Sequence, residues 1–471
     1  MAGKRKAPPA KDAAPTKKAK ATTNGSTSKD TASNGPAEEF TIQIVAGSYD
    51  RVLHGITATV KPEGTVDFAD TFLFNAHTSA VRAVAVSPPS APVPGQGQKV
   101  FLASGSTDER INLYNLSAHP PSRKNQELLS SVAPRPILEN PKNRELGTLL
   151  HHSSSITKLD FPTRSKLLSS SEDSTIAITR TRDWNVLSTI KAPKPVAQGR
   201  PTGDTAPFGG TPSGVNDFAV YPNMKLMVSV SKGEKKLRLW NLMTGKKSSP
   251  LKFPSDLLRE AGEGKYSTGE GHKIVWGPWD DTDEFAISFD RNVAVFGMDG
   301  VPKCVVMPDT RTKIHDVSYI GIEGETKQSV LAVSTEDGRV VFFSTQTDDL
   351  NDIEKDKKYP TAKLMGQVGG KDAGVSGRIK SMVLLQSKQD STAVYVAGGS
   401  SDGKVRLWRI GKKELVSGGG KQMGTLLGTY DTQNRITCMT AFGMIPRPEG
   451  VEDSEDEVEE SDDDSEDEDD E

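Results

Sequence analysis

Residues 100–116 read VFLASGSTDERINLYNL, and residues 393–410 read AVYVAGGSSDGKVRLWRI. Each stretch consists of a β-patterned run, a Gly- and Ser-rich turn that ends in Asp, and a second alternating run that leads to an aromatic residue. The acid precedes the aromatic residue by six positions, as Asp108 precedes Tyr114. Two alternating runs joined by such a turn predict an antiparallel β-hairpin.

The same template recurs five more times, so the chain carries an internal repeat. Five of the seven end positions are aromatic, although only 6% of the residues in the chain are aromatic. Further β-patterned runs precede and follow most of the hairpins, which gives four short strands per repeat. This pattern predicts an all-β, seven-bladed β-propeller of the WD-repeat type. The turn acids of the seven blades are Asp50, Asp108, Asp173, Glu234, Asp290, Asp337 and Asp402.

Successive turn acids are 47 to 65 residues apart, whereas a blade of this type needs roughly 40–45 residues. The surplus residues are therefore expected in loops. Residues 118–143 and 193–213 are rich in Pro, Ser, Gly, Lys and Arg, and residues 346–360 and 369–377 are polar or Gly-rich. These compositions are typical of loops.

The chain starts and stops out of phase with its blades. Residues 40–60 supply only a second and a third strand of the first blade, and residues 71–75 supply a fourth. The missing first strand is expected in residues 435–442 (RITCMTAF), after the last strand of the seventh blade at residues 422–428. Closing the ring with strands from both ends of the sequence leaves no open sheet edge.

The turn acids are expected to be structural. In a blade of this type the acid accepts hydrogen bonds from the turn backbone and from a His before the first strand. That His can also bond a Ser or Thr of the second strand, so buried polar groups find partners. His77 and His152 precede predicted first strands at residues 81–87 and 156–161. We therefore assign them and the seven acids to the fold rather than to catalysis.

Charge is distributed unevenly along the chain. The formal net charge is −4, but residues 451–471 contain 16 acidic and no basic residues, which leaves +12 for the rest. The first 40 residues contribute +4 of this. A basic body with a basic arm and an acidic tail indicates nucleic-acid or assembly partners.

These compositions divide the chain into three segments. Residues 39–446 are predicted to form the propeller, residues 1–38 a disordered basic arm, and residues 447–471 a disordered acidic tail. The arm holds two basic clusters with the separation of a bipartite nuclear import signal; the alternative is a solubilising or RNA-touching arm. The clusters consist of Lys4, Arg5, Lys6, Lys17, Lys18 and Lys20.

The tail suggests regulation by charge. Three of its serines have acidic residues at both +1 and +3, which suits an acid-directed kinase, and phosphorylation would add negative charge. The tail either occupies a basic surface until RNA or an acidic partner displaces it, or it keeps a basic body soluble. The three candidate phosphorylation sites are Ser454, Ser461 and Ser465.

The insertion at residues 118–143 and its edge contain scattered basic residues, which suit backbone phosphates better than base edges. The alternative is an ordinary solvated loop. The candidate RNA or partner contacts are Arg123, Lys124, Arg135, Lys142 and Arg144.

Several function classes are not expected. No stretch has the apolar length of a membrane span, and the N-terminus lacks the apolar core of a secretory signal. Cys304 and Cys438 do not make a disulfide framework or a zinc motif, and they favour a reducing compartment. No Gly-rich stretch is followed by the Lys and Ser/Thr of a phosphate loop. We therefore expect no catalytic residue, metal or cofactor, no membrane partner, and a monomer.

Three segments carry a family resemblance: VAGSYDRVLHG (45–55), ASGSTDERINLY (103–114) and GTLLHHSSSITKLDF (147–161). They resemble the first three blades of a group of eukaryotic WD-repeat proteins. This group comprises the fungal maintenance-of-killer ribosome-assembly factor and the animal p21-activated-kinase-interacting protein. The resemblance extends over residues 40–445. One departure is that the Trp279-Asp280 pair does not end a predicted third strand.

The resemblance implies a nuclear, largely nucleolar, non-catalytic scaffold in biogenesis of the large (60S) ribosomal subunit. Its implied partners are the pre-60S particle, ribosomal-like assembly proteins and pre-rRNA. The alternative function is negative regulation of a p21-activated-type protein kinase. A third hypothesis, a chaperone for histones or other basic proteins, rests on the acidic tail alone.

Overall fold

The computed structural model describes residues 39–121, 135–140, 142–194, 213–264, 267–279, 283–323, 327–353 and 355–447. These described residues form one compact unit. The expected basic arm and residues 448–471 of the expected tail lie outside the described residues. So do the central parts of the insertions at 118–143 and 193–213.

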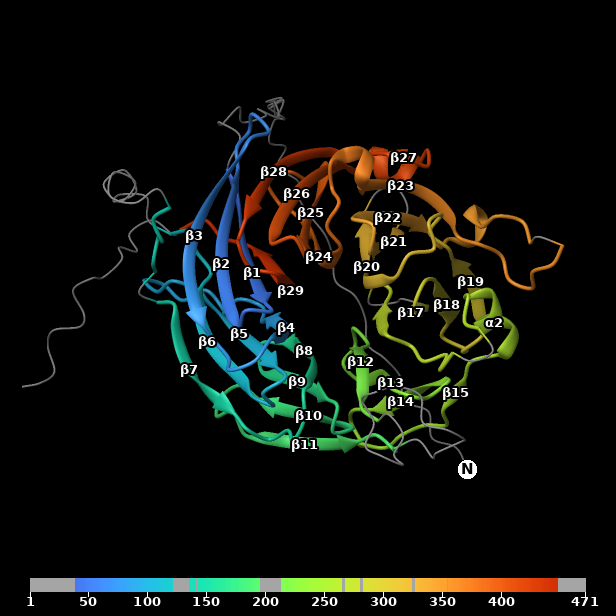
Figure 1. Ribbon diagram of the computed structural model, residues 1–471. Helices are drawn as coiled ribbons and strands as arrows, with labels where there is room; N and C mark the ends of the chain where they lie inside the picture. Colours follow the sequence, from blue (N-terminus) through green and yellow to red (C-terminus); the bar gives the residue numbers. More distant parts are fainter. Residues whose placement is uncertain are drawn as a thin grey trace, which may run out of the picture. The chain divides into compact units, whose positions relative to one another are not determined.

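Seven antiparallel sheets form a ring, as the sequence predicts (Figure 1). Each blade has four strands, and we number the blades from the one that contains β1. From inside to outside the strands are, in blade 1, β29 (Ile436–Gly443), β1 (Phe40–Ser48), β2 (Val52–Val60) and β3 (Val66–Asn75); in blade 2, β4 (Val81–Val86), β5 (Lys99–Ser106), β6 (Ile111–Ser117) and β7 (Arg144–Leu149); in blade 3, β8 (Ile156–Thr163), β9 (Lys166–Ser171), β10 (Thr175–Arg180) and β11 (Val186–Lys191); in blade 4, β12 (Val215–Val220), β13 (Leu226–Ser231), β14 (Lys236–Asn241) and β15 (Leu251–Lys252).

The remaining three blades follow the same order, and blade 6 has a fifth, short strand. Their strands are, in blade 5, β16 (Lys273–Trp276), β17 (Glu284–Ser288), β18 (Val293–Gly297) and β19 (Pro302–Val306); in blade 6, β20 (Ile314–Ile322), β21 (Gln328–Thr335), β22 (Arg339–Ser344), β23 (Lys363–Gly369) and β27 (Lys421–Gln422); in blade 7, β24 (Ile379–Gln386), β25 (Ala393–Ser400), β26 (Lys404–Gly411) and β28 (Thr425–Asp431). Short helices interrupt the loops: α2 (Ser255–Glu260), α3 (Lys412–Ser417), η1 (Thr347–Asp349) and η2 (Lys371–Ala373).

The ring closes as the sequence predicts. Strand β29, from the C-terminal part of the described chain, pairs antiparallel with β1 from Ile42↔Gly443 to Ser48↔Ile436. Beyond β29, the Met444 N–H donates to the Thr41 carbonyl at 2.8 Å and the Ile445 N–H to the Ala118 carbonyl at 2.8 Å. Blade 1 therefore joins the two ends of the propeller, and its inner edge is paired.

The outer strand of blade 7 is shifted from its predicted position. It spans Thr425–Asp431 rather than residues 422–428, because β27 pairs in parallel with β23 of blade 6 instead. Gly366 permits this close approach, since a Cβ on it would lie 2.8 Å from the Lys421 carbonyl oxygen. Met423 is then buried between blades 6 and 7.

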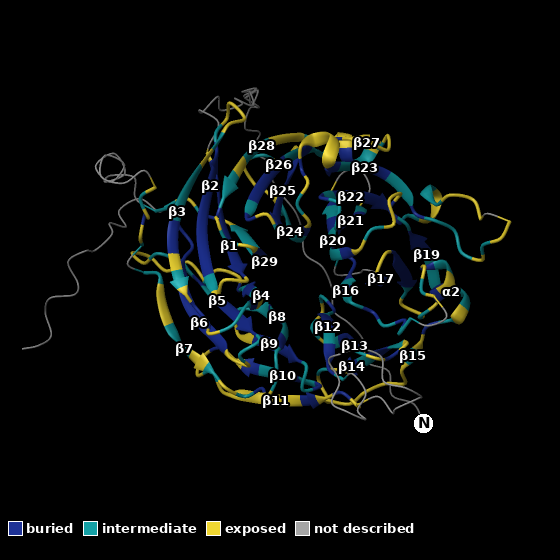
Figure 2. Cartoon of the chain, viewed as in Figure 1, coloured by how far each residue is buried: buried dark blue, intermediate teal, exposed yellow. Residues whose placement is uncertain are grey.

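The core lies between neighbouring blades. Second and third strands such as β1, β5 and β6 are buried along almost their whole length, whereas the outer strands β7 and β11 are largely exposed (Figure 2). One cluster packs Val45 and Leu53 of blade 1 against Leu102 and Tyr114 of blade 2. Because adjacent blades cover both faces of these strands, the β-branched, aliphatic and aromatic residues of the alternating runs are removed from water.

A β-bulge recurs in the first strand of six blades. The second residue of the first strand has no partner on the second strand. In blade 2, for example, Val81 pairs with Ser106 and Ala83 with Gly105, so Arg82 between them is unpaired. Bulges of this kind redirect a side chain and are frequent beside functional sites. Blade 5 lacks it, since Lys273 and Ile274 pair in continuous register. The bulge residues are Arg82, Thr157, Asn216, His315, Lys380 and Thr437.

Side chains on the first strands tie neighbouring blades together. Asp217 of blade 4 accepts a hydrogen bond from the Ile274 N–H of blade 5 at 2.9 Å, and the Lys158 ammonium of blade 3 lies 2.8 Å from it. The Thr437 hydroxyl of blade 1 donates to the Val81 carbonyl of blade 2 at 2.6 Å. These bonds fix the inner strands relative to one another, so residues on different blades hold a defined separation.

Candidate partner-binding site

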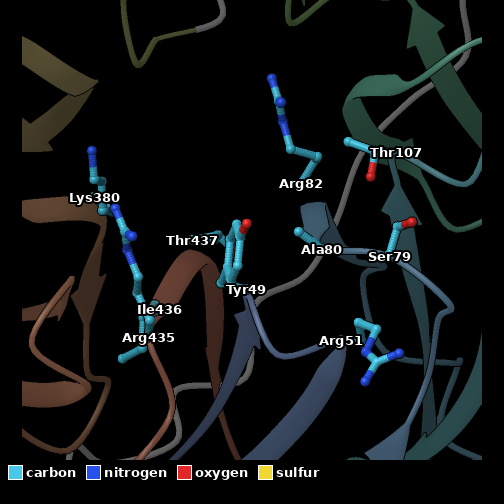
Figure 3. Close-up of a pocket in the computed structure, with 10 residues that line it drawn as sticks. All are labelled: Tyr49, Arg51, Ser79, Ala80, Arg82, Thr107, Lys380, Arg435, Ile436 and Thr437. Atoms are coloured by element: carbon cyan, nitrogen blue, oxygen red, sulfur yellow. The ribbon is translucent and has the colours of Figure 1, made fainter.

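A pocket of about 700 Å³ opens where blades 7, 1 and 2 meet (Figure 3). It lies on the face of the ring at which the first strands begin, which we call the front face. The turns between second and third strands lie on the same face, because antiparallel pairing brings the end of each second strand beside the start of the first. The pocket is lined by Tyr49, Arg51, Ser79, Ala80, Arg82, Thr107, Lys380, Arg435, Ile436 and Thr437.

Four of these ten lining residues are basic and none is acidic. Arg82 and Lys380 are the bulge residues of β4 and β24, so neither residue is in register with the neighbouring strand. Arg435 directly precedes β29, and Arg51 occupies the β1–β2 turn with a φ of 72°. The fold therefore gathers cations from three blades that are far apart in the sequence.

The carboxylates near the pocket are engaged with other groups. Asp50 accepts a hydrogen bond from the Arg435 backbone N–H at 3.3 Å. Asp316 accepts one from the Met382 N–H at 3.1 Å. Glu336 pairs with the Arg378 guanidinium at 3.0 Å. Positive charge at the pocket thus exceeds the negative charge that lines it.

Lys380 shows the effect of this excess. Burial lowers its pKa, and the neighbouring cations Arg378, Arg435 and Lys313 lower it further, against an opposing effect of Glu336. The Lys380 ammonium lies 3.3 Å from His315 Nε2. Burial, together with the charges of Lys380, Lys313 and Arg378, lowers the pKa of His315 to about 4, so this imidazole is neutral at pH 7 and accepts the bond.

Tyr49 gives the pocket an aromatic side chain. It is 59% exposed, and the Arg435 guanidinium lies 5.7 Å from its ring centroid. Figure 3 shows Tyr49 between Lys380 and Arg435 on one side and Arg51 on the other. A ligand in the pocket would thus meet an aromatic face surrounded by positive charge.

The turn acids of blades 2 and 3 make the expected contacts with a histidine, which also contacts a serine of the second strand. His77 Nδ1 lies 3.1 Å from Asp108, and its Nε2 lies 2.8 Å from the Ser104 hydroxyl of the second strand. In blade 3, His152 makes the equivalent contacts with Asp173 at 3.1 Å and Ser169 at 2.8 Å. These histidines and acids connect the blade-to-blade loop, the turn and the second strand.

The other turn acids occupy the same turns with different partners. In blade 4 Arg238 replaces the histidine and donates to Glu234 at 2.7 Å, and in blade 7 Arg406 donates to Asp402 at 2.9 Å. Asp337 is held by three side chains of its surroundings, Thr310, Thr335 and Arg339. Asp290 lies 3.2 Å from His272 Nε2 and 3.3 Å from the Lys313 ammonium.

The described basic residues of the 118–143 insertion and its edge do not line the front-face pocket. Arg123 and Lys124 lie outside the described residues. Arg135 donates to the Asp431 carbonyl at 3.0 Å, with its guanidinium 5.3 Å from the Tyr430 ring centroid, on the outer side of blades 1 and 7. Lys142 is half-buried, and Arg144 is exposed at the start of β7.

Sequence reasoning did not identify Arg51, Arg82, Lys380 and Arg435 as a set. The available signal was a basic residue at the second position of two first strands, VRAV and IKSM. A regular alternating strand gives no reason for that position to leave the sheet register. The bulge moves this residue out of the register, and a bulge depends on how the strands pair in the folded protein.

Conventional catalytic features are few in the described chain. Burial raises the pKa of the Cys304 and Cys438 thiols to about 12, so both are protonated at pH 7. Within the described ranges, no three His, Cys, Asp or Glu residues are grouped as metal ligands. The helices that the structure describes are all too short or too polar to cross a membrane.

Residues 143–179 match the family model described as "WD domain, G-beta repeat". This range runs from β7 through β10. The chain is 26% identical over 399 residues to a "p21-activated protein kinase-interacting protein 1-like" of Danio rerio, which covers 84% of this chain and 80% of the relative.

Two fungal proteins are also similar. "Protein MAK11" of Saccharomyces cerevisiae is 26% identical over 431 residues, covering 84% of this chain and 82% of its own. "Shk1 kinase-binding protein 15" of Schizosaccharomyces pombe is 24% identical over 220 residues, covering 46% and 49%.

A ring of seven four-stranded blades with this repeat match defines a WD-repeat β-propeller protein. The similarity runs along most of the chain and is shared by relatives from animals and yeast. Within the WD-repeat class, the chain is similar to the p21-activated-kinase-interacting proteins and to MAK11, in agreement with the sequence resemblance.

Proposed function

We propose that this protein is a non-catalytic scaffold in assembly of the large (60S) ribosomal subunit. In this role it docks on the precursor particle in the nucleolus through propeller loops, together with ribosomal-like assembly proteins and pre-rRNA. The observation that carries the proposal is the similarity to MAK11 along 84% of the chain, in the group that the sequence resemblance associates with ribosome assembly.

The charge of the molecule supports this function. Without the acidic tail the chain carries +12, and the front-face pocket concentrates four cations. Particles rich in RNA and in acidic protein segments attract such a surface at long range. A rigid ring with loops on both faces is also suited to holding several partners at fixed positions.

Affinity purification of the tagged full-length protein at moderate salt tests the proposal. We expect large-subunit precursor rRNA and assembly factors to be retained. Retention of neither, from cells in which the tagged protein replaces the native one, would contradict it. Imaging of the same protein checks location: we expect a nucleolar signal that is lost when the six basic residues of the two N-terminal clusters are changed to Ala.

A second candidate function is binding and negative regulation of a p21-activated-type kinase. It is favoured by the names of two relatives, a p21-activated protein kinase-interacting protein and a kinase-binding protein. The same purification discriminates the two functions. A kinase of this type retained without precursor rRNA, with the protein at the cell cortex, would support the second.

A further inference from the structure

We propose that the front-face pocket is a docking site for an acidic, extended peptide segment of a partner protein. Its carboxylates would lie among Arg51, Arg82, Lys380 and Arg435, with an apolar or aromatic residue beside Tyr49. This assignment deepens the scaffold function by naming the chemistry of one contact. It also holds if the partner belongs to a different assembly.

Positive charge in the pocket lining is not offset by acidic lining residues. The four cations come from blades 7, 1 and 2, and the lining contains no acid. Among the neighbouring carboxylates, Asp50 and Asp316 accept hydrogen bonds from backbone amides, Glu336 pairs with Arg378, and Asp108 is held by His77 and the Thr78 N–H. A half-buried Lys380 among other cations is stabilised when an anion enters, because the anion offsets both burial and like-charge repulsion.

The fold also determines where these cations lie. Arg82 and Lys380 leave the register of their strands at bulges, and the inner strands of blades 1 and 2 are held together by the Thr437–Val81 bond of 2.6 Å. The backbone positions that carry these basic side chains are therefore fixed before a ligand arrives. A site organised in advance loses less conformational entropy on binding than one built from mobile lysines.

The composition of the lining favours a peptide over RNA as the ligand. The pocket is a cavity of about 700 Å³ with apolar groups, Ala80, Ile436 and the Tyr49 ring, among its polar ones. Single-stranded nucleic acids are bound by basic grooves in which several aromatic residues stack successive bases. Only one aromatic residue lines this cavity, and Arg435 lies over its ring. A pocket with mixed apolar and cationic lining fits the side chains of an acidic peptide better.

The test measures binding of a fluorescein-labelled decapeptide of alternating Glu and Asp with one central Leu, by fluorescence anisotropy. The protein is the full chain, compared with its R82E/R435E variant. We expect each charge reversal to weaken binding about tenfold and the pair about a hundredfold. We also expect wild-type binding to weaken with added salt.

Matched variants keep the result interpretable. R182E makes the same charge change at an exposed residue between β10 and β11, on the opposite face, and should leave the affinity within about twofold of wild type. R82Q/R435Q removes the charges without reversing them, and circular dichroism melting checks that each variant is folded. Equal affinities of wild type, R82E/R435E and R182E would overturn the proposal.

Two further outcomes identify a different occupant. If a decauridine RNA competes with the peptide and itself binds more tightly, with a loss of affinity in R82E/R435E, the pocket is an RNA site and the peptide assignment is wrong. If deletion of residues 448–471 strengthens peptide binding in wild type but not in R82E/R435E, the protein's own tail fills the pocket, and the assignment to a partner is wrong. Failure to recover ribosomal precursors would affect the proposed function and not this site.

Discussion

Blades 2 and 3 differ from blades 4 and 7 in how they hold the same turn acid. In blades 2 and 3 the acid bonds a histidine from the loop before the first strand, and that histidine reaches a serine of the second strand. In blades 4 and 7 an arginine four residues after the acid, on the third strand, takes this role. The histidine contact joins the loop before the first strand to the turn, whereas the arginine contact lies within a single hairpin.

The serine of the second strand changes its role accordingly. In blade 4 Ser229 accepts a hydrogen bond from Trp240 Nε1 at 2.8 Å. In blade 7 the equivalent position is Gly398, on which a Cβ would lie 2.9 Å from the Trp408 ring. The difference teaches that these four blades each give the turn acid a side-chain hydrogen-bond partner but do not use a fixed set of residues to do so.

The largest effect is expected from Arg238→Met in blade 4. The Glu234 and Arg238 side chains are 4% and 6% exposed, so the variant leaves a buried carboxylate with only Lys236 nearby. We expect the free energy of unfolding to fall by about 3 kcal/mol. Urea unfolding measures it. The Glu234→Leu/Arg238→Met double variant should recover much of the loss, and failure to recover would show that packing rather than charge is responsible.

A smaller difference is expected between Asp173→Asn in blade 3 and Asp402→Asn in blade 7. Asp173 accepts bonds from His152, the Ser153 N–H and the Thr175 N–H, which an amide NH₂ group cannot all satisfy. Its side chain is 10% exposed, against 29% for Asp402. We expect losses of about 2 and about 1 kcal/mol, respectively, in thermal unfolding. Equal losses would remove the distinction between the two kinds of blade.

The histidine blades should respond to mild acid before the arginine blades. Burial lowers the pKa of His77, and burial with the His152 charge lowers the pKa of His151 to about 4. Unfolded histidine binds a proton near pH 6.5, so the folded state binds fewer protons between pH 6.5 and about 4. Stability is therefore full above pH 6.5 and falls as the pH drops through this window.

Hydrogen exchange at pH 7 and pH 5 measures this response. Peptides from β8 to β10 should lose protection at pH 5 relative to peptides from β13 and β14, because arginine stays protonated throughout. His151→Gln should reduce the pH dependence of melting. The lowered pKa values of Asp108 and Asp173 act in a separate window, since their contribution is present above about pH 3.8 and is lost only below it.

The smallest effect is expected from Ser229→Ala. It removes the acceptor of the buried Trp240 N–H and should lower the free energy of unfolding by about 1 kcal/mol. Ser188→Ala on the exposed strand β11 is the control and should be neutral. A loss no greater than that of the control would show that the Trp240 bond adds nothing to the packing of blade 4.

Local periodicity predicted most of the fold. The hairpins around Asp108 and Asp402 were predicted because two β-patterned runs flank a Gly- and Ser-rich turn, and the missing first strand of blade 1 followed from counting strands. The outer strand of blade 7 was misplaced because nothing in the sequence of residues 421–422 indicates that they pair with blade 6. That pairing depends on the close approach of the two strands at Gly366. The pocket was not predicted, because its cations meet through bulges and ring closure.

The order of synthesis gives the closing strand a further consequence. The edge of β1 is exposed from the time blade 1 leaves the ribosome until β29 has been made, and unpaired edges attract other strands. Arg435, Ile436 and Thr437 of the pocket arrive with the same segment. A partner that binds the proposed front-face site would therefore distinguish a finished ring from a nascent chain.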